Sequence, residues 1–342
     1  MTTFVVRRVL LSVVVVFGVT LITFVLARVV PQDVARVWAG FQGFQAGEET
    51  IRATEERYRL NDPLHVQYGY YLWDLVTFDW GRSPITTRAV ADDIKAYLPN
   101  TIELSVAAML LAIAAGIPLG IVSATRRNSI FDHGARVAAL FGVSAPGFWV
   151  AMLLQLVVYY RLGWVEDPGG RLSNAVQRTY PVESVTGFLI IDTVLTGNWV
   201  AFRDACEHLI LPSLTLALPL VALISRMVRS SMLEVLGQDY VRTARAKGLT
   251  ERTVVGRHAF RNAVIPTITV IALSTGWLLT GAVVTEVVFY WPGLGQYAVG
   301  AVLSFDFPAI IAFTAISATI FVLVNLAADI AYVYLDPRVR LR

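Results

Sequence analysis

The 342-residue chain is poor in cysteine, lysine and charge, and each shortage excludes a class of structure or activity. Cysteine occurs once, at Cys206, so no internal disulfide can form. Lysine occurs only at Lys95 and Lys247, and neither follows a glycine. A phosphate-binding loop needs a Gly-Lys pair, so we expect the chain to hydrolyse no ATP itself.

Residues that carry chemistry are also scarce. The sequence has no His-Glu-x-x-His, no cysteine pair and no Gly-x-Ser-x-Gly, so we expect no catalytic, cofactor-binding or metal-binding residues. The net charge of +3 gives no reason to expect a nucleic-acid partner. The four histidines are then expected at surfaces and helix ends, at His65, His133, His208 and His258.

Apolar residues are abundant instead. They make up 56% of the chain, the mean hydropathy is +0.61 and only 15% of residues are charged, against about 25% in soluble domains. A helix needs about 20 apolar residues to cross a bilayer, and only helices or closed barrels satisfy their backbone there. The sequence predicts an all-α polytopic membrane protein with six transmembrane helices, at 9–30, 100–124, 137–160, 209–226, 263–286 and 308–330.

Arginine placement predicts the orientation. With both termini in the cytoplasm, 16 of the 28 basic residues fall in short cytoplasmic segments, as the positive-inside rule requires. We therefore expect a multi-pass protein of the cell membrane, with residues 1–30 as its first span. Residues 31–99 would form an external helical cap, and residues 100–342 a five-helix core. That core would carry an external insertion at 161–208 and a cytoplasmic loop at 227–262.

One apolar run, at 184–202, could be mistaken for a seventh span. It contains Asp192 and Asn198, and a charge at mid-membrane costs about 2.5–3.5 kcal/mol on insertion scales. A span there would also move eight basic residues to the outside. We therefore predict an external, partly apolar helix that lies on the bundle, and we expect the first apolar run to remain as a span and not as a cleaved signal peptide.

The segment 239–266, DYVRTARAKGLTERTVVGRHAFRNAVIP, is too basic for lipid and too patterned for a slack loop. Asp239 can cap a helix at 240–247, and Gly248 suits the left-handed position that ends one. Thr250 can cap a second short helix, with Glu251 first and Arg257 late. Two interpretations of this segment remain open. In one, its cations hold the loop on the cytoplasmic side of the membrane; in the other, the segment is a docking element for a partner.

A second candidate site follows the fifth span. The stretch VFYWPGLG can form a tight turn or a short re-entrant helix, and Asp306 can cap the sixth span. An ordinary interfacial turn explains the pattern as well as a gate does. If it is an external gate, its residues are Glu286, Trp291, Pro292, Gly293 and Asp306.

The whole chain resembles the permease subunits of ABC-type dipeptide, oligopeptide and nickel importers. The resemblance rests on motifs in order, among them RRVLLSVVVVFGVTLITFVLARVVP, LNDPLHVQY, DWGRS, GVSAPGFWV, HLILPSLTLAL, VFYWPGLG and LDPRVR, with YVRTARAKGL and RHAFRNAVIP in the loop. Two departures stand out. Arg242-Thr243-Ala244 replaces the Glu-Ala-Ala of the general importer loop, as is usual in the peptide branch. Residues 31–34 read Pro-Gln-Asp-Val where the family often has Pro-Gly-Asp-Pro.

The resemblance implies a division of labour. A second homologous permease would complete the pathway, one or two ATPase subunits would use ATP and magnesium, and an external substrate-binding protein would deliver di- or oligopeptides. Nickel or oligosaccharides are the alternative substrates, while an intramembrane enzyme or a stand-alone carrier fits the residues less well. The loop residues that would couple the permease to the ATPase are Tyr240, Val241, Arg242, Ala244, Arg245, Lys247, Gly248 and Leu249.

Overall fold

A computed structural model describes residues 2–29, 34–38, 48–164 and 169–335. These residues form helices joined by loops and turns, with one isolated β-bridge between Arg82 and Ala89. The α-helices are α1 (Thr2–Val29), α2 (Val34–Trp38), α3 (Glu48–Arg57), α4 (Leu64–Thr77), α5 (Val90–Thr125), α6 (Ile130–Ser144), α7 (Gly147–Leu154), α8 (Asn174–Thr179), α9 (Leu189–Leu195), α10 (Trp199–Leu236), α11 (Asp239–Ala246), α12 (Glu251–Thr253), α13 (Arg261–Gly281), α14 (Val283–Val288), α15 (Leu294–Leu303) and α16 (Phe307–Leu335). Two π-helical segments, η2 (Gln155–Arg161) and η3 (Val254–Phe260), continue α7 and α12.

Long apolar helices confirm the predicted fold class. Five are long and apolar enough to cross a membrane, and a sixth crossing is available if a bent pair counts as one span. Helices α5 and α10 run to 36 and 38 residues, well beyond the predicted spans at 100–124 and 209–226. Their extra turns carry charged residues such as Asp93 and Arg229, which lower local hydropathy without ending a helix.

The third span differs most from its prediction. Instead of one rod at 137–160, α6 and the α7–η2 segment meet at an angle of 108°. The break falls at Ala145 and Pro146. Proline has no N–H to donate and forces the preceding residue out of the helical region, and Ala145 accordingly has φ −73° and ψ 130°. Hydropathy cannot register this bend, because the residues on both sides are apolar.

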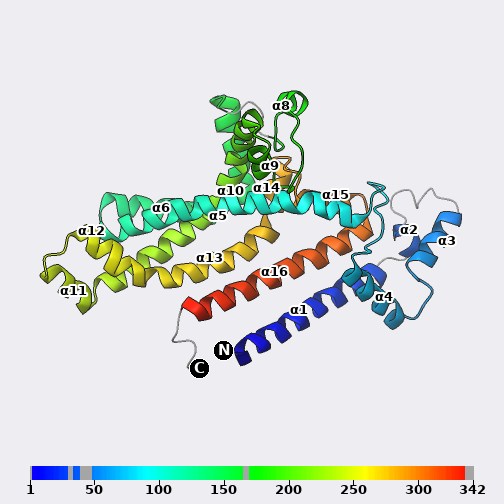
Figure 1. The fold of residues 1–342 in the computed structure, drawn as a ribbon, viewed down its shortest axis with the longest axis horizontal. Coiled ribbons are helices and arrows are strands. Elements are labelled where there is room, and N and C mark those ends of the chain that lie inside the picture. The colour runs from blue at the N-terminus through cyan, green and yellow to red at the C-terminus, as the bar shows by residue number, and fades with distance from the viewer. Residues whose placement is uncertain (1, 30–33, 39–47, 165–168, 336–342) are drawn as a thin grey trace.

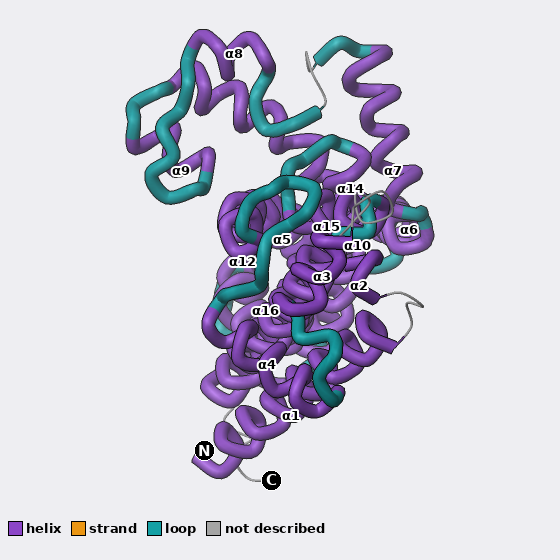
Figure 2. Tube along the Cα trace, turned by 90° about the vertical axis from the view of Figure 1, so that its right-hand side faces the viewer, coloured by secondary structure: helices purple, strands orange, loops and turns teal. Residues whose placement is uncertain are grey.

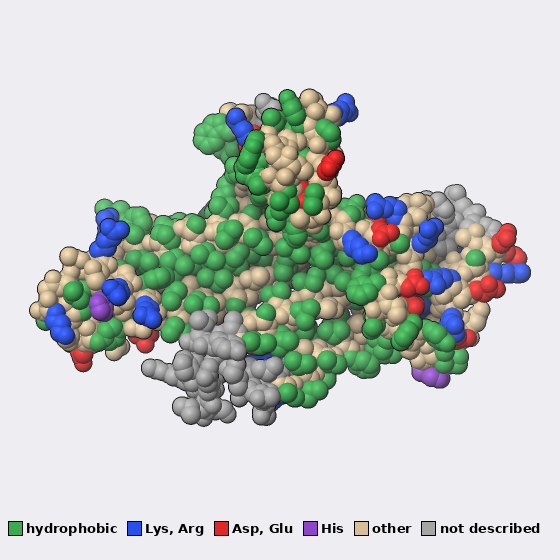
Figure 3. All heavy atoms as spheres, in the orientation of Figure 1, with side chains coloured by type: hydrophobic (Ala, Val, Ile, Leu, Met, Phe, Trp, Pro, Cys, Tyr) green, Lys and Arg blue, Asp and Glu red, His purple; other side chains and the backbone are tan. Residues whose placement is uncertain are grey.

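Figure 1 shows the long helices running roughly side by side, with α11 at one end and α2, α3 and α4 at the other. We call these the α11 end and the α4 end. Figure 2 shows α7 and the α8–α9 segment as separate projections from the bundle. Hydrophobic side chains cover the middle of the visible face in Figure 3, and charged side chains gather at the two ends and on the projections. That distribution fits a bundle whose long axis crosses the bilayer.

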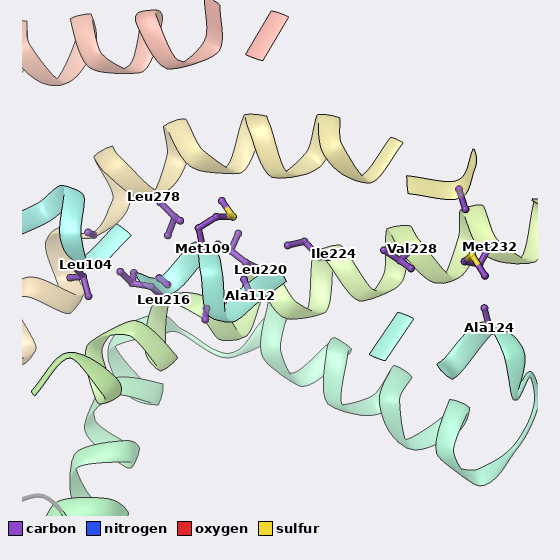
Figure 4. Close-up of a cluster of buried hydrophobic side chains, with 14 of the residues drawn as sticks. Leu104, Met109, Ala112, Ala124, Leu216, Leu220, Ile224, Val228, Met232 and Leu278 are labelled. Atoms are coloured by element: carbon purple, nitrogen blue, oxygen red, sulfur yellow. The ribbon is translucent and has the colours of Figure 1, made fainter. Parts of the chain in front are cut away.

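The main core lies between α5, α10 and α13. Leu104, Ile224 and Leu278 are fully buried in it, and Figure 4 shows side chains of this cluster pointing toward one another between the helices. Glycine lets α5 and α10 approach closely. A Cβ on Gly116 would lie 2.9 Å from the Ile224 Cγ2, and one on Gly120 only 2.6 Å from the Val228 Cβ. These two glycines therefore serve helix packing.

The segment predicted as a cap, 31–99, is helical where it is described. It contains α2, α3, α4 and the first ten residues of α5. An aromatic cluster packs it against α1 and α16, with Phe24, Trp38 and Tyr71 buried beside Ile311. Of residues 31–34, where the sequence departs from the family pattern, 31–33 lie outside the described residues and Val34 opens α2. The ambiguous run 184–202 forms α9 and the first turn of α10, and no separate span.

Candidate functional site: the α11 loop and the turn before α15

Helix α11 spans Asp239–Ala246, one residue earlier at each end than predicted. Asp239 is therefore inside the first turn and not the cap, since Gln238 occupies that position without a side-chain hydrogen bond. An acid in the first turn and Arg245 in the last still match the helix dipole. The short helix is thus stabilised by its own sequence as well as by its packing.

Two of the predicted coupling residues face inward. Val241 is fully buried and Ala244 is 6% exposed, and both pack against the buried Val254 of η3. Val235 and Leu236, at the end of α10, complete this small cluster. The buried face fixes α11 on the ends of two long helices, so Val241 and Ala244 can act through the position of α11 and not by touching a partner.

The other predicted residues lie on the exposed side. The guanidinium of Arg245 pairs with Glu251 through Nε at 2.6 Å, and Arg242 lies 3.4 Å from Asp239. The Tyr240 hydroxyl accepts a hydrogen bond of 2.8 Å from the Asn262 amide. Lys247 and Leu249 are exposed as well. The surface of α11 is therefore basic, with two apolar side chains, Tyr240 and Leu249.

Gly248 ends the α11 segment in the left-handed conformation that its position predicted, with φ +76°. The predicted second short helix, however, is not separate. Helix α12 begins at Glu251, passes through η3 and continues as α13, so that one apolar helix covers Glu251–Leu279. No residue from Glu251 to Gly281 has a positive φ, and Pro266 lies within the helix without ending it. Between the end of α10 at Leu236 and the start of α12 at Glu251 lie only α11 and its flanking turns.

A buried ion pair supports the base of this region, and sequence reasoning missed it. Arg229 on α10 donates to both Asp132 carboxylate oxygens, at 2.7 and 2.8 Å. Asp132 is fully buried, and it also accepts from the Ser123 hydroxyl at the end of α5 and from the Asn128 N–H. One carboxylate thereby joins α5, α6 and α10. The sequence does contain two signals that could have predicted this pair. One is an arginine within an otherwise apolar helical run, and the other is a Ser-x-x-Asp pattern at the start of α6.

The candidate gate residue Glu286 lies under the turn that leads into α15. It is fully buried, and its carboxylate accepts hydrogen bonds from the Thr101 hydroxyl at 2.6 Å, from the Gly295 N–H at 2.6 Å and from the Gln296 N–H at 3.0 Å. A carboxylate at a helix N-terminus is stabilised by the free N–H groups and the dipole. A Cβ on Gly293 would lie 2.3 Å from this carboxylate, so the turn requires glycine there.

Trp291 and Pro292 join the same cluster. The Trp291 indole, 1% exposed, donates to the Asn100 carbonyl at 3.0 Å, and the Asn100 amide donates to the Pro292 carbonyl at 2.5 Å. The structure therefore brings four of the five candidate gate residues together against the same stretch of α5.

An arginine from the insertion, Arg171, completes this network. No pattern in the sequence predicted this role. Arg171 donates to the Asn100 side chain and to Glu103, each at 2.5 Å. Glu103 in turn accepts from the Ile190 N–H at the start of α9. Asn100 and Glu103 thus tie the insertion to the Trp291 turn, although Arg171 is far from both in sequence.

Asp306 is held apart from the other gate candidates. It caps α16, accepting from the Ala309 N–H at 3.1 Å, and it accepts from the Ser83 hydroxyl. Burial raises the pKa of Asp306, and hydrogen bonds from Ser83 and Ala309 oppose that rise. Its position matches the predicted helix cap more closely than a shared gate.

Across the residues that the structure describes, no group of three His, Cys, Asp or Glu side chains could hold a metal ion. The Trp291 turn is held by a polar network and α11 by an apolar cluster, and both arrangements position helices.

The geometry and the long helices define the class of protein: a multi-pass membrane component in which a helix projects beyond the bundle. Comparison with known proteins gives the family. Residues 116–341 match the family described as "Binding-protein-dependent transport system inner membrane component", and residues 1–105 match "Binding-prot-dependent transport system membrane comp, N-term". The chain belongs to this family, which confirms the resemblance found from its motifs.

Curated relatives extend over the full length. The chain is 42% identical over 340 residues, 99% of this chain and 100% of the relative, to the dipeptide transport system permease protein DppB of Alkalihalophilus pseudofirmus. It is 43% identical over 327 residues, 96% of this chain and 94% of the relative, to the probable D,D-dipeptide transport system permease protein DdpB of Escherichia coli. Over 340 residues, 99% of each chain, it is 37% identical to the oligopeptide transport system permease protein AppB of Bacillus subtilis.

Proposed function

We propose that the chain forms half of the translocation pathway of an ATP-driven importer of di- or oligopeptides. The peptide substrate is supported by the names of its full-length relatives, several of which are dipeptide or oligopeptide permeases. A second homologous permease would supply the other half, and an external substrate-binding protein would deliver the peptide. The chain itself would bind no cofactor, since ATP and magnesium would be used by one or two ATPase subunits.

Helix α11 would be the coupling element. The observation that carries this proposal is the packing of α11 against the end of α10 and against η3. A coupling element must move as a unit with its partner and pass that motion to the spans. Val241 and Ala244 anchor α11 to the end of α10 and to η3, which continues into α13. The opposite face offers Tyr240, Leu249 and basic side chains to an ATPase surface that carries carboxylates.

The orientation follows from the same proposal. With α11 in the cytoplasm, both termini are cytoplasmic, and α2–α4 with the insertion lie outside. The positive-inside rule supports this arrangement, because the α11 loop and its flanking helix ends hold eight basic residues. If the cysteine of a Lys247→Cys variant reacts with a reagent added outside intact cells, this orientation is wrong.

The second permease would cover apolar surface that the single chain leaves bare. Helix α6 and the α7–η2 segment expose large apolar side chains, including Val137, Phe141, Trp149 and Tyr160. The chain's own α10 and α14 segments cover only one side of α7, where Ala151 is buried beside Leu211 and Phe289, so the other side of α7–η2 stays exposed. The Trp291 turn, on the outer side of the core in this orientation, would be the external gate.

A substitution on the exposed face of α11 tests coupling without disturbing the fold. Arg242 is 72% exposed and contacts Asp239 of its own helix. We expect Arg242→Glu to reduce both peptide uptake and co-purification of the ATPase subunits, because it opposes the carboxylates of the partner. The matched control is Arg178→Glu on α8, which changes the same charge away from α11. Normal uptake by both Arg242→Glu and a second variant, Leu249→Asp, would contradict the proposed role of α11.

A further inference from the structure

A polar cavity of about 170 Å³ lies at the α4 end, between α1, the α2–α4 segment and the first turns of α16. Arg28, the last residue of the α1 span, forms part of its wall. Trp38, Tyr71, Gln67 and Ile311 line it from three other helices. We call it the Arg28 pocket, and neither the coupling loop nor the Trp291 turn contributes to it.

Arg28 is held in place but lacks partners for much of its hydrogen-bonding capacity. Its guanidinium carbon lies 3.9 Å from the centre of the Trp38 ring, and its Nη2 donates weakly to the Tyr58 carbonyl at 3.4 Å. The Nε and Nη1 groups are buried without a hydrogen-bond partner, and no carboxylate forms an ion pair with Arg28 among the described residues.

Two further polar atoms in the wall are also buried and unpaired. These are the hydroxyl of Tyr71 and the Oε1 atom of Gln67, on side chains that are 9% and 5% exposed. Burial, with a smaller contribution from Tyr68, raises the pKa of Tyr71, so its hydroxyl keeps its proton and can donate. Several unpaired polar groups thus share one cavity, which is large enough for more than a single water molecule.

The charged residues that line the described part of the cavity carry one more positive than negative charge. Its lining includes three arginines and two aspartates. On the half-exposed rim, Arg57 pairs with Asp79 at 2.8 Å, and Arg59 lies over the Tyr70 ring at 3.6 Å. Buried guanidinium N–H groups without an acceptor are costly, and an oxyanion that accepts from them removes that cost.

We propose that the Arg28 pocket binds the phosphate group of an anion, with the Arg28 guanidinium and the Tyr71 hydroxyl as donors. The position favours a phospholipid headgroup as the source. Arg28 ends a helix that crosses the membrane, where headgroups lie, and tyrosine and tryptophan rings around it are typical of the membrane interface. Free inorganic phosphate has the same chemistry and is the other source.

Retained lipid is the first measurement. The full-length chain would be purified in mild detergent from vesicles of phosphatidylglycerol and phosphatidylethanolamine, and examined by native mass spectrometry. We expect phospholipid bound to the wild type and to the control Arg178→Gln. In Arg28→Gln the bound fraction should fall about tenfold, the effect of losing one charge-assisted hydrogen bond. Such a result supports the proposal with lipid as the source.

Tyr71→Phe keeps the test informative if Arg28→Gln fails to fold. If the hydroxyl donates to a bound phosphate, Tyr71→Phe lowers lipid retention; if the hydroxyl has no ligand, its removal leaves retention unchanged and the fold no less stable. Inorganic phosphate would then be added to delipidated protein. A rise in unfolding temperature in wild type but not in Tyr71→Phe supports free phosphate. No difference between wild type and Tyr71→Phe in either measurement overturns the proposal.

Discussion

The α11 loop and the Trp291 turn place charge in opposite ways. Around α11 the small apolar residues Val241 and Ala244 are buried, and the charged residues face outward. In the turn, the charged Glu286 is buried, and Gly293 provides the space beside its carboxylate. The first arrangement leaves charged side chains on the surface, where we propose that the ATPase subunit binds, and the second uses its polar groups in contacts within the chain. Substitutions of charged residues should therefore affect partner binding at α11 but stability at the turn.

The largest expected effect is at Glu286. Glu286→Ala leaves the Thr101 hydroxyl and the N–H groups of Gly295 and Gln296 without an acceptor, at about 1–3 kcal/mol each. We expect a loss of about 4 kcal/mol in the free energy of unfolding, measured by thermal or denaturant unfolding in detergent. The control is Glu234→Ala, at an exposed position on α10. Equal stability of the two variants would remove the contrast between the regions.

Arg171 should come next. Arg171→Met leaves Glu103 buried without its ion-pair partner, and breaking a buried pair typically costs about 3 kcal/mol or more. We expect the insertion around α9 to exchange amide hydrogens faster, because Glu103 also holds the Ile190 N–H. The double variant Arg171→Met with Glu103→Leu should lose less stability than the sum of the single variants. Additive losses would mean that the pair does not act as one unit.

A smaller effect is expected at Gly248. Gly248→Ala places a side chain in the left-handed region, which costs about 1 kcal/mol, and no atom lies within 4 Å of the added Cβ. Strain alone should therefore weaken the end of α11 and slow uptake. Gly256→Ala is a close control, since its added Cβ also has open space but its φ is not positive. There alanine should be neutral or stabilising, so only Gly248→Ala should destabilise the protein.

The smallest effect is a pH dependence in the insertion, where the buried carboxylate of Asp192 accepts hydrogen bonds from backbone N–H groups. Burial acts to raise the pKa of Asp192, but hydrogen bonds from Thr186 and Gly187 outweigh it and leave the pKa below its usual value. A lowered folded-state pKa gives stability that is present above the unfolded pKa, about 4, and is lost as pH falls through the folded value. Unfolding measured from pH 6 to pH 3 should show this loss, and Asp192→Asn should remove it.

Much of the fold could be predicted, because apolar length alone identifies helices that cross a membrane. The Ala145–Pro146 bend could not, since the proline predicts a break but not the 108° between its halves. At the α11 loop, the Gly248 conformation followed from residue type, whereas the burial of Val241 depends on Val254 in a later helix. Arg171 and Asp132 were missed for the same reason: their partners are distant in sequence, and one sequence carries no information on such pairs.

The helix from Glu251 to Leu279 has a mechanical consequence. Its 29 residues, seven of them in the more compact π-helical η3, form a rod roughly 40 Å long at about 1.5 Å per α-helical residue. One end packs beneath Val241, and the other reaches Leu278 in the cluster that contains Trp291. A rigid rod of that length converts a tilt of about five degrees at one end into a shift of about 4 Å at the other, given this rise per residue. Motion on one side of the bilayer can therefore arrive on the opposite side without any relay of side chains.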